Sequence, residues 1–323
     1  MFKRALAIIS IVLVGHVLQA QQLPLYSQYM LNGFIINSAM AGSDGFTSFN
    51  LTTRQQWFGI NYAPRTFSMT AQTRILSRSH KIKVNLRKGN TFIPARSGRM
   101  GLGVSIYNDR NGYFGQSGIN LSYAYHISFI SSQLSFGLSG SVTQYKINQD
   151  GIQFRLNDPR SIGVTEPIYV PDANVGAYYL RQNFYVGISV ASLLQSVVKY
   201  GNESLASYQM KRHYYFLAGY KFYPEVIMAI EPSVLVKTTE SFLPQADFSV
   251  KAYYYERYWF GLSYRTSNTL IFSLGLQKGK VYIGYAFDYG VSSFQQNTMG
   301  SHELNLSLKF GDSAKRYRWL RRY

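Results

Sequence analysis

The sequence alternates apolar residues with small or polar ones along most of its length. Val281, Ile283 and Phe287 face one way in such a pattern, while Gly284 and Asp288 face the other. A period of two is typical of a β-strand with one apolar face. Because the pattern recurs from about residue 44 onward, we predict an all-β chain.

We predict about 14 strands from this alternation and from the turn residues between the segments. The predicted strands span 44–56, 64–75, 98–108, 115–126, 133–146, 172–181, 184–191, 212–221, 226–237, 244–254, 258–265, 269–276, 280–289 and 301–311.

The polar faces of these strands carry few charges. Charged residues make up 15 % of the chain, whereas aromatic residues make up 16 % and Tyr occurs 28 times. This composition is typical of a transmembrane barrel, with apolar side chains in lipid, small polar ones in the lumen and Tyr at the interfaces. Closure is required because a lipid-exposed strand edge leaves backbone groups unpaired. We therefore predict an outer-membrane antiparallel β-barrel, with a soluble β-protein as the alternative.

The connections support this topology, since an even strand count puts both ends of the barrel in the periplasm. Predicted periplasmic turns are short, and they include 181–183, 223–225, 256–257 and 278–280. Predicted external loops at 147–171 and 192–211 are long. The segment 76–97 is an exception, because it is long yet is predicted to be periplasmic.

The N-terminus resembles a signal peptide. Lys3 and Arg4 precede an apolar run, and Ala20 ends a small-residue cleavage pattern. The run is short for a membrane anchor, which is the alternative. We expect a signal peptide at 1–20, an N-terminal segment at 21–43, a barrel at 44–311 and a basic periplasmic tail at 312–323.

The segment 21–43 contains several aromatic and apolar residues, among them Tyr26, Tyr29, Met30 and Phe34. Exposed aromatic residues without a partner favour association. We therefore predict that this segment packs inside the lumen as a plug, and the alternative is a position along the periplasmic rim.

Charged residues suggest two further groups. By strand parity, four charges share the small-residue face and are predicted to line the lumen: Glu231, Asp247, Lys251 and Asp288. The chain has a net charge of +18. Its basic residues concentrate in two segments that the topology brings to the periplasmic side: Arg78, Lys81, Lys83, Arg87, Lys88, Lys315, Arg316, Arg318, Arg321 and Arg322. Such a surface binds an acidic partner or lipid head groups, or is simply solvated. We expect no nucleic-acid partner.

No catalytic pattern is present in the sequence. Cys is absent, and His80, His126, His213 and His302 form no short metal-binding motif. We predict no enzyme activity, no metal and no cofactor. An outer-membrane hydrolase that uses Ser with His is a less favoured alternative.

Several motifs together resemble the PorP/SprF family of type IX secretion system membrane proteins. The resemblance rests on SQYMLN at 27–32, on Asn37 and on AG at 41–42. It continues with RQQWFGI at 54–60, AP at 63–64, GLGVSIYND at 101–109, NLSYAY at 120–125 and EPSVL at 231–235. The chain departs from the family at Gly33 and Ser38, where the family often has Pro after Asn.

The resemblance implies an outer-membrane component of type IX secretion, typical of Bacteroidetes. Relatives assist secretion or surface attachment of proteins such as gliding-motility adhesins. Implied partners are outer-membrane lipid, periplasmic components of the secretion system and a secreted adhesin or other cargo. The motif residues are expected to be structural or partner-binding: Gln28, Tyr29, Asn32, Asn37, Gly42, Arg54, Trp57, Gly59 and Pro64. The alternative function is an outer-membrane channel or a transporter of hydrophobic substrates.

Overall fold

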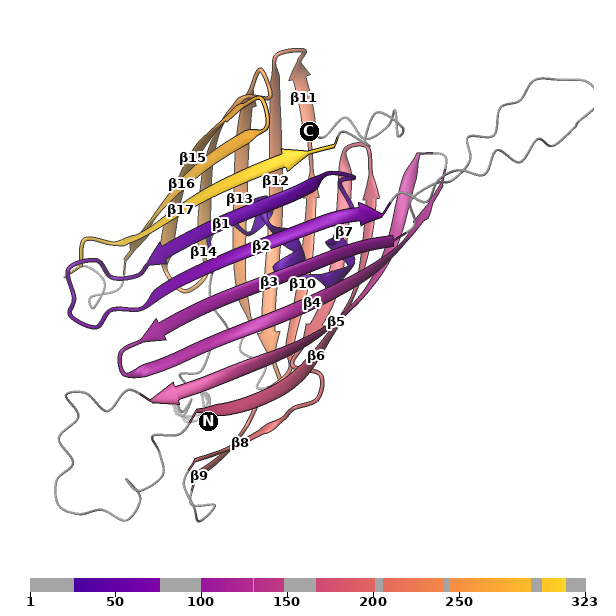
Figure 1. Cartoon of the computed structure of the whole chain (residues 1–323). Coiled ribbons are helices and arrows are strands. Elements are labelled where there is room, and N and C mark those ends of the chain that lie inside the picture. Colours follow the sequence, from indigo (N-terminus) through magenta and orange to yellow (C-terminus); the bar gives the residue numbers. More distant parts are fainter. Residues whose placement is uncertain are drawn as a thin grey trace, which may run out of the picture.

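The computed structural model describes residues 26–75, 100–129, 131–147, 167–200, 206–240, 244–291 and 298–311. Within these residues, fourteen antiparallel strands form a closed barrel (Figure 1). The barrel strands are β1 (Thr47–Gln55), β2 (Arg65–Ile75), β3 (Met100–Asn111), β4 (Phe114–Ser128), β5 (Ser132–Ile147), β6 (Ile168–Arg181), β7 (Phe184–Ala191), β10 (His213–Tyr220), β12 (Met228–Thr239), β13 (Gln245–Tyr254), β14 (Tyr258–Arg265), β15 (Thr269–Lys278), β16 (Val281–Gly290) and β17 (Ser301–Phe310). Each overlaps one predicted strand, which confirms the predicted fold class.

The barrel closes where its first and last strands meet. β1 pairs with β17 in one unbroken register, from Thr47 opposite Phe310 to Gln55 opposite His302. On the far side of the ring, β10 pairs with both β7 and β12. Every barrel strand therefore has a neighbour on each side, which satisfies its backbone hydrogen bonds without a free edge.

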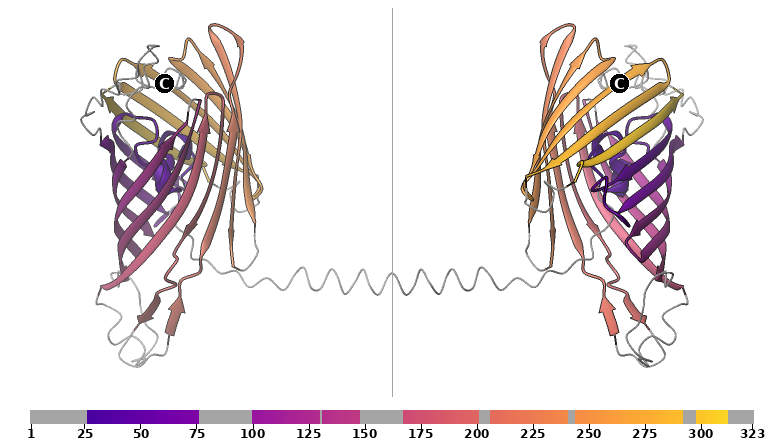
Figure 2. Two further views of the ribbon diagram at one scale, coloured as in Figure 1. Left: turned by 90° about the vertical axis from the view of Figure 1, so that its right-hand side faces the viewer. Right: turned by 90° about the vertical axis from the view of Figure 1, so that its left-hand side faces the viewer.

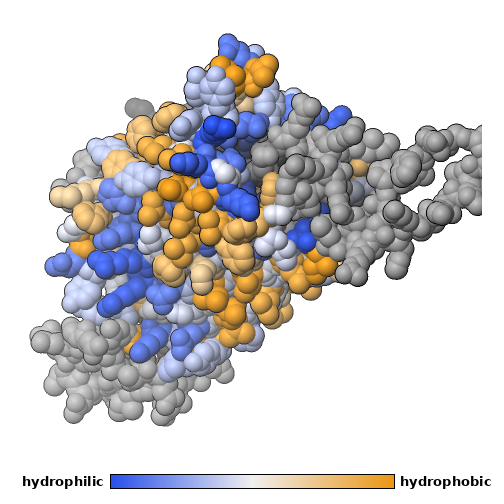
Figure 3. Space-filling model, turned by 45° about the horizontal axis from the view of Figure 1, so that its top comes forward, coloured by the Kyte–Doolittle hydropathy of each residue, from blue (hydrophilic) through white to orange (hydrophobic). Residues whose placement is uncertain are grey.

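The walls are apolar outside and polar inside. On β1, the side chain of Phe49 is 47 % exposed while that of Asn50 is 2 % exposed. On β17, Leu304 is exposed and Asn305 is buried in the same way. Figure 3 shows a broad hydrophobic area on the outer surface of the barrel. The inside-out arrangement predicted from the period of two is thus confirmed.

Some connections differ from the sequence prediction. The predicted loop 192–211 contains a two-stranded hairpin, β8 (Val197–Tyr200) with β9 (Ala206–Gln209), which extends beyond the barrel (Figures 1 and 2). The predicted turn at 223–225 is instead a short strand, β11 (Phe222–Glu225), which pairs with β12 through a register shift. Pro224 is accommodated because proline is tolerated at such irregularities.

The N-terminal segment from Tyr26 to Phe46 precedes β1 and lies inside the ring of strands in both side views (Figure 2). It forms three short 3₁₀ helices, η1 (Tyr29–Leu31), η2 (Gly33–Ile35) and η3 (Ser38–Met40). η3 contacts the strands β4, β5 and β6. In the described part of the chain, no helix has the length and apolar character needed to cross a membrane.

Candidate functional site

The polar inner face concentrates charge at one place, close to where β1 meets β17. Arg54 on β1 is buried, and its guanidinium donates to Asp288 Oδ2 at 2.7 Å and to Glu303 Oε2 at 3.2 Å. Asp288 lies on β16 and Glu303 on β17, so these three residues, the Arg54 cluster, connect three adjacent strands. A buried ion pair contributes stability only when the charged groups are well hydrogen-bonded. The two short contacts of Arg54 meet part of this requirement.

A second buried pair extends the cluster. Arg265 on β14 binds Asp247 on β13 through two nitrogens, with Nε–Oδ1 and Nη2–Oδ2 distances of 2.9 Å each. Its remaining nitrogen, Nη1, lies 3.6 Å from Asp288 Oδ2. Asp288 therefore links the two arginines, and a continuous charged network covers the inner wall from β1 to β13.

The Arg54 cluster also binds the N-terminal segment. The backbone N–H groups of Ser27 and Gln28 donate to the two carboxylate oxygens of Glu303, at 2.7 and 2.8 Å. The Ser27 hydroxyl donates to Asp288 Oδ2 at 2.7 Å and accepts from Arg54 Nη1 at 2.8 Å. The carboxylates thus act as acceptors for the start of the segment as well as counter-ions for Arg54.

Asparagine side chains attach the middle of the segment to the strands. Asn32 Nδ2 donates to the hydroxyl of Thr70 on β2, at 2.8 Å. Asn37 Nδ2 donates to the backbone carbonyls of Ala177 on β6 and Ile188 on β7, at 3.0 and 3.1 Å. Two asparagines of the family motif therefore bind separate parts of the wall.

The end of the segment is held by a tight turn. The Gly42 N–H donates to Gln72 Oε1 at 3.0 Å. Gly42 has a φ of +65°, and a Cβ there would lie 2.8 Å from the carbonyl oxygen of Thr73. Glycine is required here both by the left-handed backbone and by the close approach to β2.

Glycines on the strands make room for the segment. A Cβ at Gly137 on β5 would overlap the backbone of Ser38 and Ala39, and a Cβ at Gly101 on β3 would overlap the carbonyl of Ala41. The paired glycines of the 101–109 motif, Gly101 and Gly103, therefore serve close packing.

Apolar side chains also attach the N-terminal segment to the strands. Tyr29 is buried in a cluster with Tyr178, Tyr185, Leu217 and Leu235, which lie on four different strands. Burial raises the pKa of the Tyr29 phenol to about 12, so the ring stays neutral at physiological pH. Phe34 forms a second buried cluster with Ala41 and Ala124.

The predicted lumen charges all lie on the inner face but belong to different contacts. Asp247 and Asp288 are part of the charged network described above. Glu231 accepts a hydrogen bond from the Tyr185 hydroxyl at 3.1 Å. The Lys251 ammonium lies 4.5 Å from the centre of the Trp259 ring, and Lys251 pairs with Glu231 in the β12–β13 register.

The remaining motif residues lie away from the lumen. Trp57, Gly59 and Pro64 belong to the connection from β1 to β2, in which Trp57 and Gly59 have positive φ values of 48° and 99°. The Gln56 N–H donates to the Pro64 carbonyl at 2.9 Å. These residues shape the loop between the two strands.

Sequence reasoning missed Arg265, Glu303 and Ser27. Arg265 and Glu303 follow the same parity as the small inner residues Ser263 and Asn305, so the period of two could have placed them in the lumen. All ten residues of the predicted basic periplasmic face lie outside the described residues.

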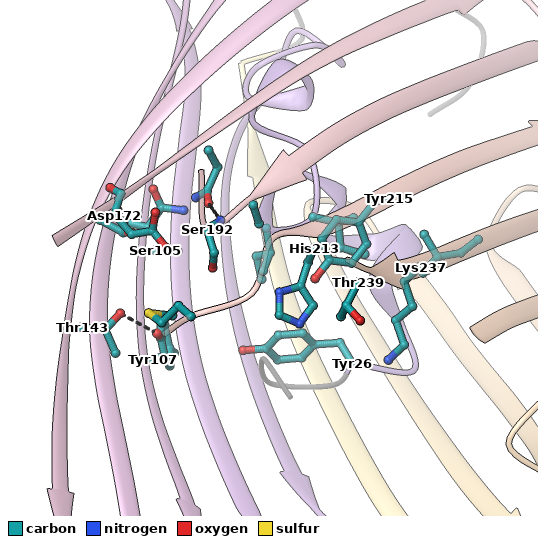
Figure 4. A pocket seen from close by; sticks show the side chains of 18 of the residues that line it. Tyr26, Ser105, Tyr107, Thr143, Asp172, Ser192, His213, Tyr215, Lys237 and Thr239 are labelled. Carbon is teal, nitrogen blue, oxygen red and sulfur yellow. Dashed lines mark hydrogen bonds between the residues drawn. The ribbon is translucent and has the colours of Figure 1, made fainter. Parts of the chain in front are cut away.

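Cavities lie on both sides of the N-terminal segment. The hairpin-side cavity, at the end of the barrel from which β8 and β9 extend, has a volume of about 180 Å³ and is lined by Tyr26, Ile35 and Ile36 of the segment (Figure 4). The turn-side cavity, of about 120 Å³, is lined by Tyr29 and Phe34 of the same segment. In the described residues, no group of His, Asp and Glu side chains is arranged to hold a metal ion.

The family model for type IX secretion system membrane protein PorP/SprF matches residues 18–308. A search of curated proteins finds no match. Among solved structures, outer membrane protein Omp33 of Acinetobacter baumannii is 9 % identical, with a TM-score of 0.43 over 83 % of this chain and 99 % of that one. The toluene transporter TodX of Pseudomonas putida is 10 % identical, with a TM-score of 0.44 over 86 % and 92 %. Since the family model covers most of the sequence, the chain belongs to the PorP/SprF family of type IX secretion system membrane proteins.

Proposed function

We propose that this outer-membrane component of type IX secretion is a docking barrel, which supports the secretion or surface anchoring of a protein such as an adhesin through protein–protein contacts. One observation carries the proposal. Residues 26–46 lie between the two cavities and bind the strands β1, β2, β6, β7, β16 and β17. A lumen occupied in this way favours a binding role over a conduit.

The segment would therefore act as a plug. Its hydrogen bonds reach opposite walls, and its apolar residues pack against Tyr178, Tyr185 and Leu217. Displacing it would break the contacts of Ser27 and Gln28 with buried carboxylates, which are charge-assisted and so stronger than neutral hydrogen bonds. We infer that the plug stays in place while the barrel works. We further propose export by a cleaved signal peptide at 1–20, which lies outside the described residues.

A disulfide across the plug tests this function. The chain has no cysteine, and Asn32 lies within hydrogen-bond distance of Thr70, so Asn32→Cys with Thr70→Cys would join the plug to β2. In a strain that lacks the gene, secretion or surface display of the cargo should be lost. The wild-type chain and the oxidised double variant should restore it equally, with Asn32→Cys alone as the matched control.

Two results would argue against the docking barrel. Normal secretion and normal surface proteins in the deleted strain would remove the secretion role altogether. Loss of secretion only when the double variant is oxidised, with recovery after reduction, would indicate that the plug must move. That result would favour the channel or transporter.

A further inference from the structure

Resting on the docking role above, we propose that the hairpin-side cavity binds a carboxylate next to an apolar side chain on a peptide segment of the partner, with Lys237 as the carboxylate-binding residue. The cavity faces the end of the barrel that is predicted to be external. Its volume of about 180 Å³ is below the roughly 300–1,000 Å³ of pockets for drug-sized ligands. It therefore suits one or two side chains, not a folded domain.

Lys237 is the cationic group in this cavity without a counter-ion. It lies near the end of β12, and in the described part of the chain its ammonium has neither an ion pair nor a hydrogen bond. Asp247 also lines the cavity, but both of its carboxylate oxygens are bound by Arg265. Asp247 is thus committed to another cation, and Lys237 remains open to a ligand.

Asp172 is the other carboxylate of the lining, and it lies on the opposite side of the cavity from Lys237 (Figure 4). Its Oδ1 accepts from the backbone N–H groups of Ala173 and Leu194, at 2.7 and 3.2 Å. These bonds give Asp172 a structural role in the connection that follows β7. It does not neutralise Lys237.

A second polar group lines the same cavity. The ring of His213 on β10 points into the cavity beside Tyr26 and Lys237 (Figure 4). The His213 ring has a hydrogen bond with the backbone of Lys211. An imidazole has two ring nitrogens, so one bond to the backbone leaves the other for a ligand. Lys237 and His213 together therefore form one polar corner that fits a carboxylate.

The rest of the cavity lining indicates which group on the ligand would lie next to its carboxylate. Ile35 and Ile36 of the plug and Leu235 of β12 contribute an apolar part of the lining next to the polar corner. A carboxylate held by Lys237 would place an adjacent aliphatic side chain against these residues. A chain end and an Asp or Glu side chain both offer this chemistry, since capture of a terminal carboxylate is a recurring mode of peptide recognition.

Short acetylated peptides test the site on the purified full-length protein in detergent, by isothermal titration calorimetry. The probes are acetyl-alanyl-leucyl-leucine as the free acid, the same peptide as its amide, and acetyl-alanyl-leucyl-glutamic acid amide. We expect at least one acid to bind about tenfold or more tightly than the uncharged amide, because hydrogen bonds to charged groups contribute that much. The acid that binds identifies whether the carboxylate comes from a chain end or a side chain.

Variants of two inward-facing lysines, Lys237 and Lys251, complete the test. Lys237→Met should abolish the preference for acid over amide, and Lys237→Arg should retain part of it. Lys251→Met is the matched control, because Lys251 lines the turn-side cavity, and it should leave the preference unchanged. The folded fraction of each variant is checked by its heat-dependent mobility on gels.

The site would be overturned by equal binding of acid and amide, by no binding of any peptide, or by a preference that persists in Lys237→Met. Acetate that binds as tightly as the peptides would overturn the assignment to a peptide. These results are independent of the secretion experiment, which tests the docking role without reference to Lys237.

Discussion

At the scale of single residues, Arg54 determines how charge is tolerated inside this barrel. Its guanidinium contacts Asp288, Glu303 and the Ser27 hydroxyl, and all three charged side chains are at most 3 % exposed. Buried charges are costly unless each is paired. The cluster therefore stabilises the barrel only as a set, and loss of its cation leaves two carboxylates without their main partner.

Arg54→Met should accordingly destabilise the barrel by about 3–5 kcal/mol, the usual effect of removing one partner from a buried ion pair. The measurement is the temperature at which the folded band is lost on an unboiled gel. Arg110→Met is the control, since Arg110 is exposed at the end of β3. Addition of Glu303→Gln to Arg54→Met should recover part of the loss. Equal melting of the Arg54 and Arg110 variants would contradict the role of the cluster.

Another prediction concerns two glycines on β5. A Cβ at Gly137 would overlap the backbone of the N-terminal segment at Ala39, whereas a Cβ at Gly140 meets nothing within 4 Å. Gly137→Ala should therefore cost about 1–3 kcal/mol through overpacking, and Gly140→Ala should have little effect. Gly137→Ala should also lower the yield of the disulfide between Cys at positions 32 and 70. Identical melting and disulfide yields in the two variants would show that the N-terminal segment does not pack against β5.

At the scale of elements, the barrel strands could be predicted because their alternation is a local property of the sequence. The β8–β9 hairpin was missed because VVKY and ASYQ lack a clear period of two. β11 was missed because Pro224 indicated a turn. The contact of Asn37 with β6 and β7 could not be predicted either, because it joins residues that are 140 and 151 positions apart. The alternation along a strand predicts which face of the sheet a side chain lies on. Its contact partner depends on the register between strands, which the alternation does not give.

At the scale of the whole molecule, orientation in the membrane follows from which turns face the periplasm. Ser267 lies in the turn before β15 and Lys278 is the last residue of that strand, and both are exposed. Ser267→Cys should react with a membrane-impermeant maleimide on intact cells. Lys278→Cys should react only after the outer membrane is permeabilised. The reverse labelling pattern would place the hairpin end in the periplasm.

The basic segments, which lie outside the described residues, lead to a second prediction at this scale. If they dock an acidic partner, replacement of Arg316, Arg318, Arg321 and Arg322 by Gln should preserve membrane insertion while reducing partner recovery and cargo secretion. Recovery from the wild-type chain should fall as salt rises, because exposed charges are screened beyond about 8–10 Å at physiological ionic strength. Normal recovery and secretion after neutralisation of both basic segments would indicate that these charges are only solvated.

The position of the Arg54 cluster also constrains the order in which the molecule assembles. Gln28 binds Glu303, which is 275 positions later in the chain, and Arg54 joins β1 to the last two strands to be synthesised. Contacts of such high sequence separation form late and slow folding. The N-terminal segment therefore cannot be fixed before the ends of the barrel have met. Its attachment would thus report on completion of the barrel: a chain that stops short of β17 would keep this segment loose.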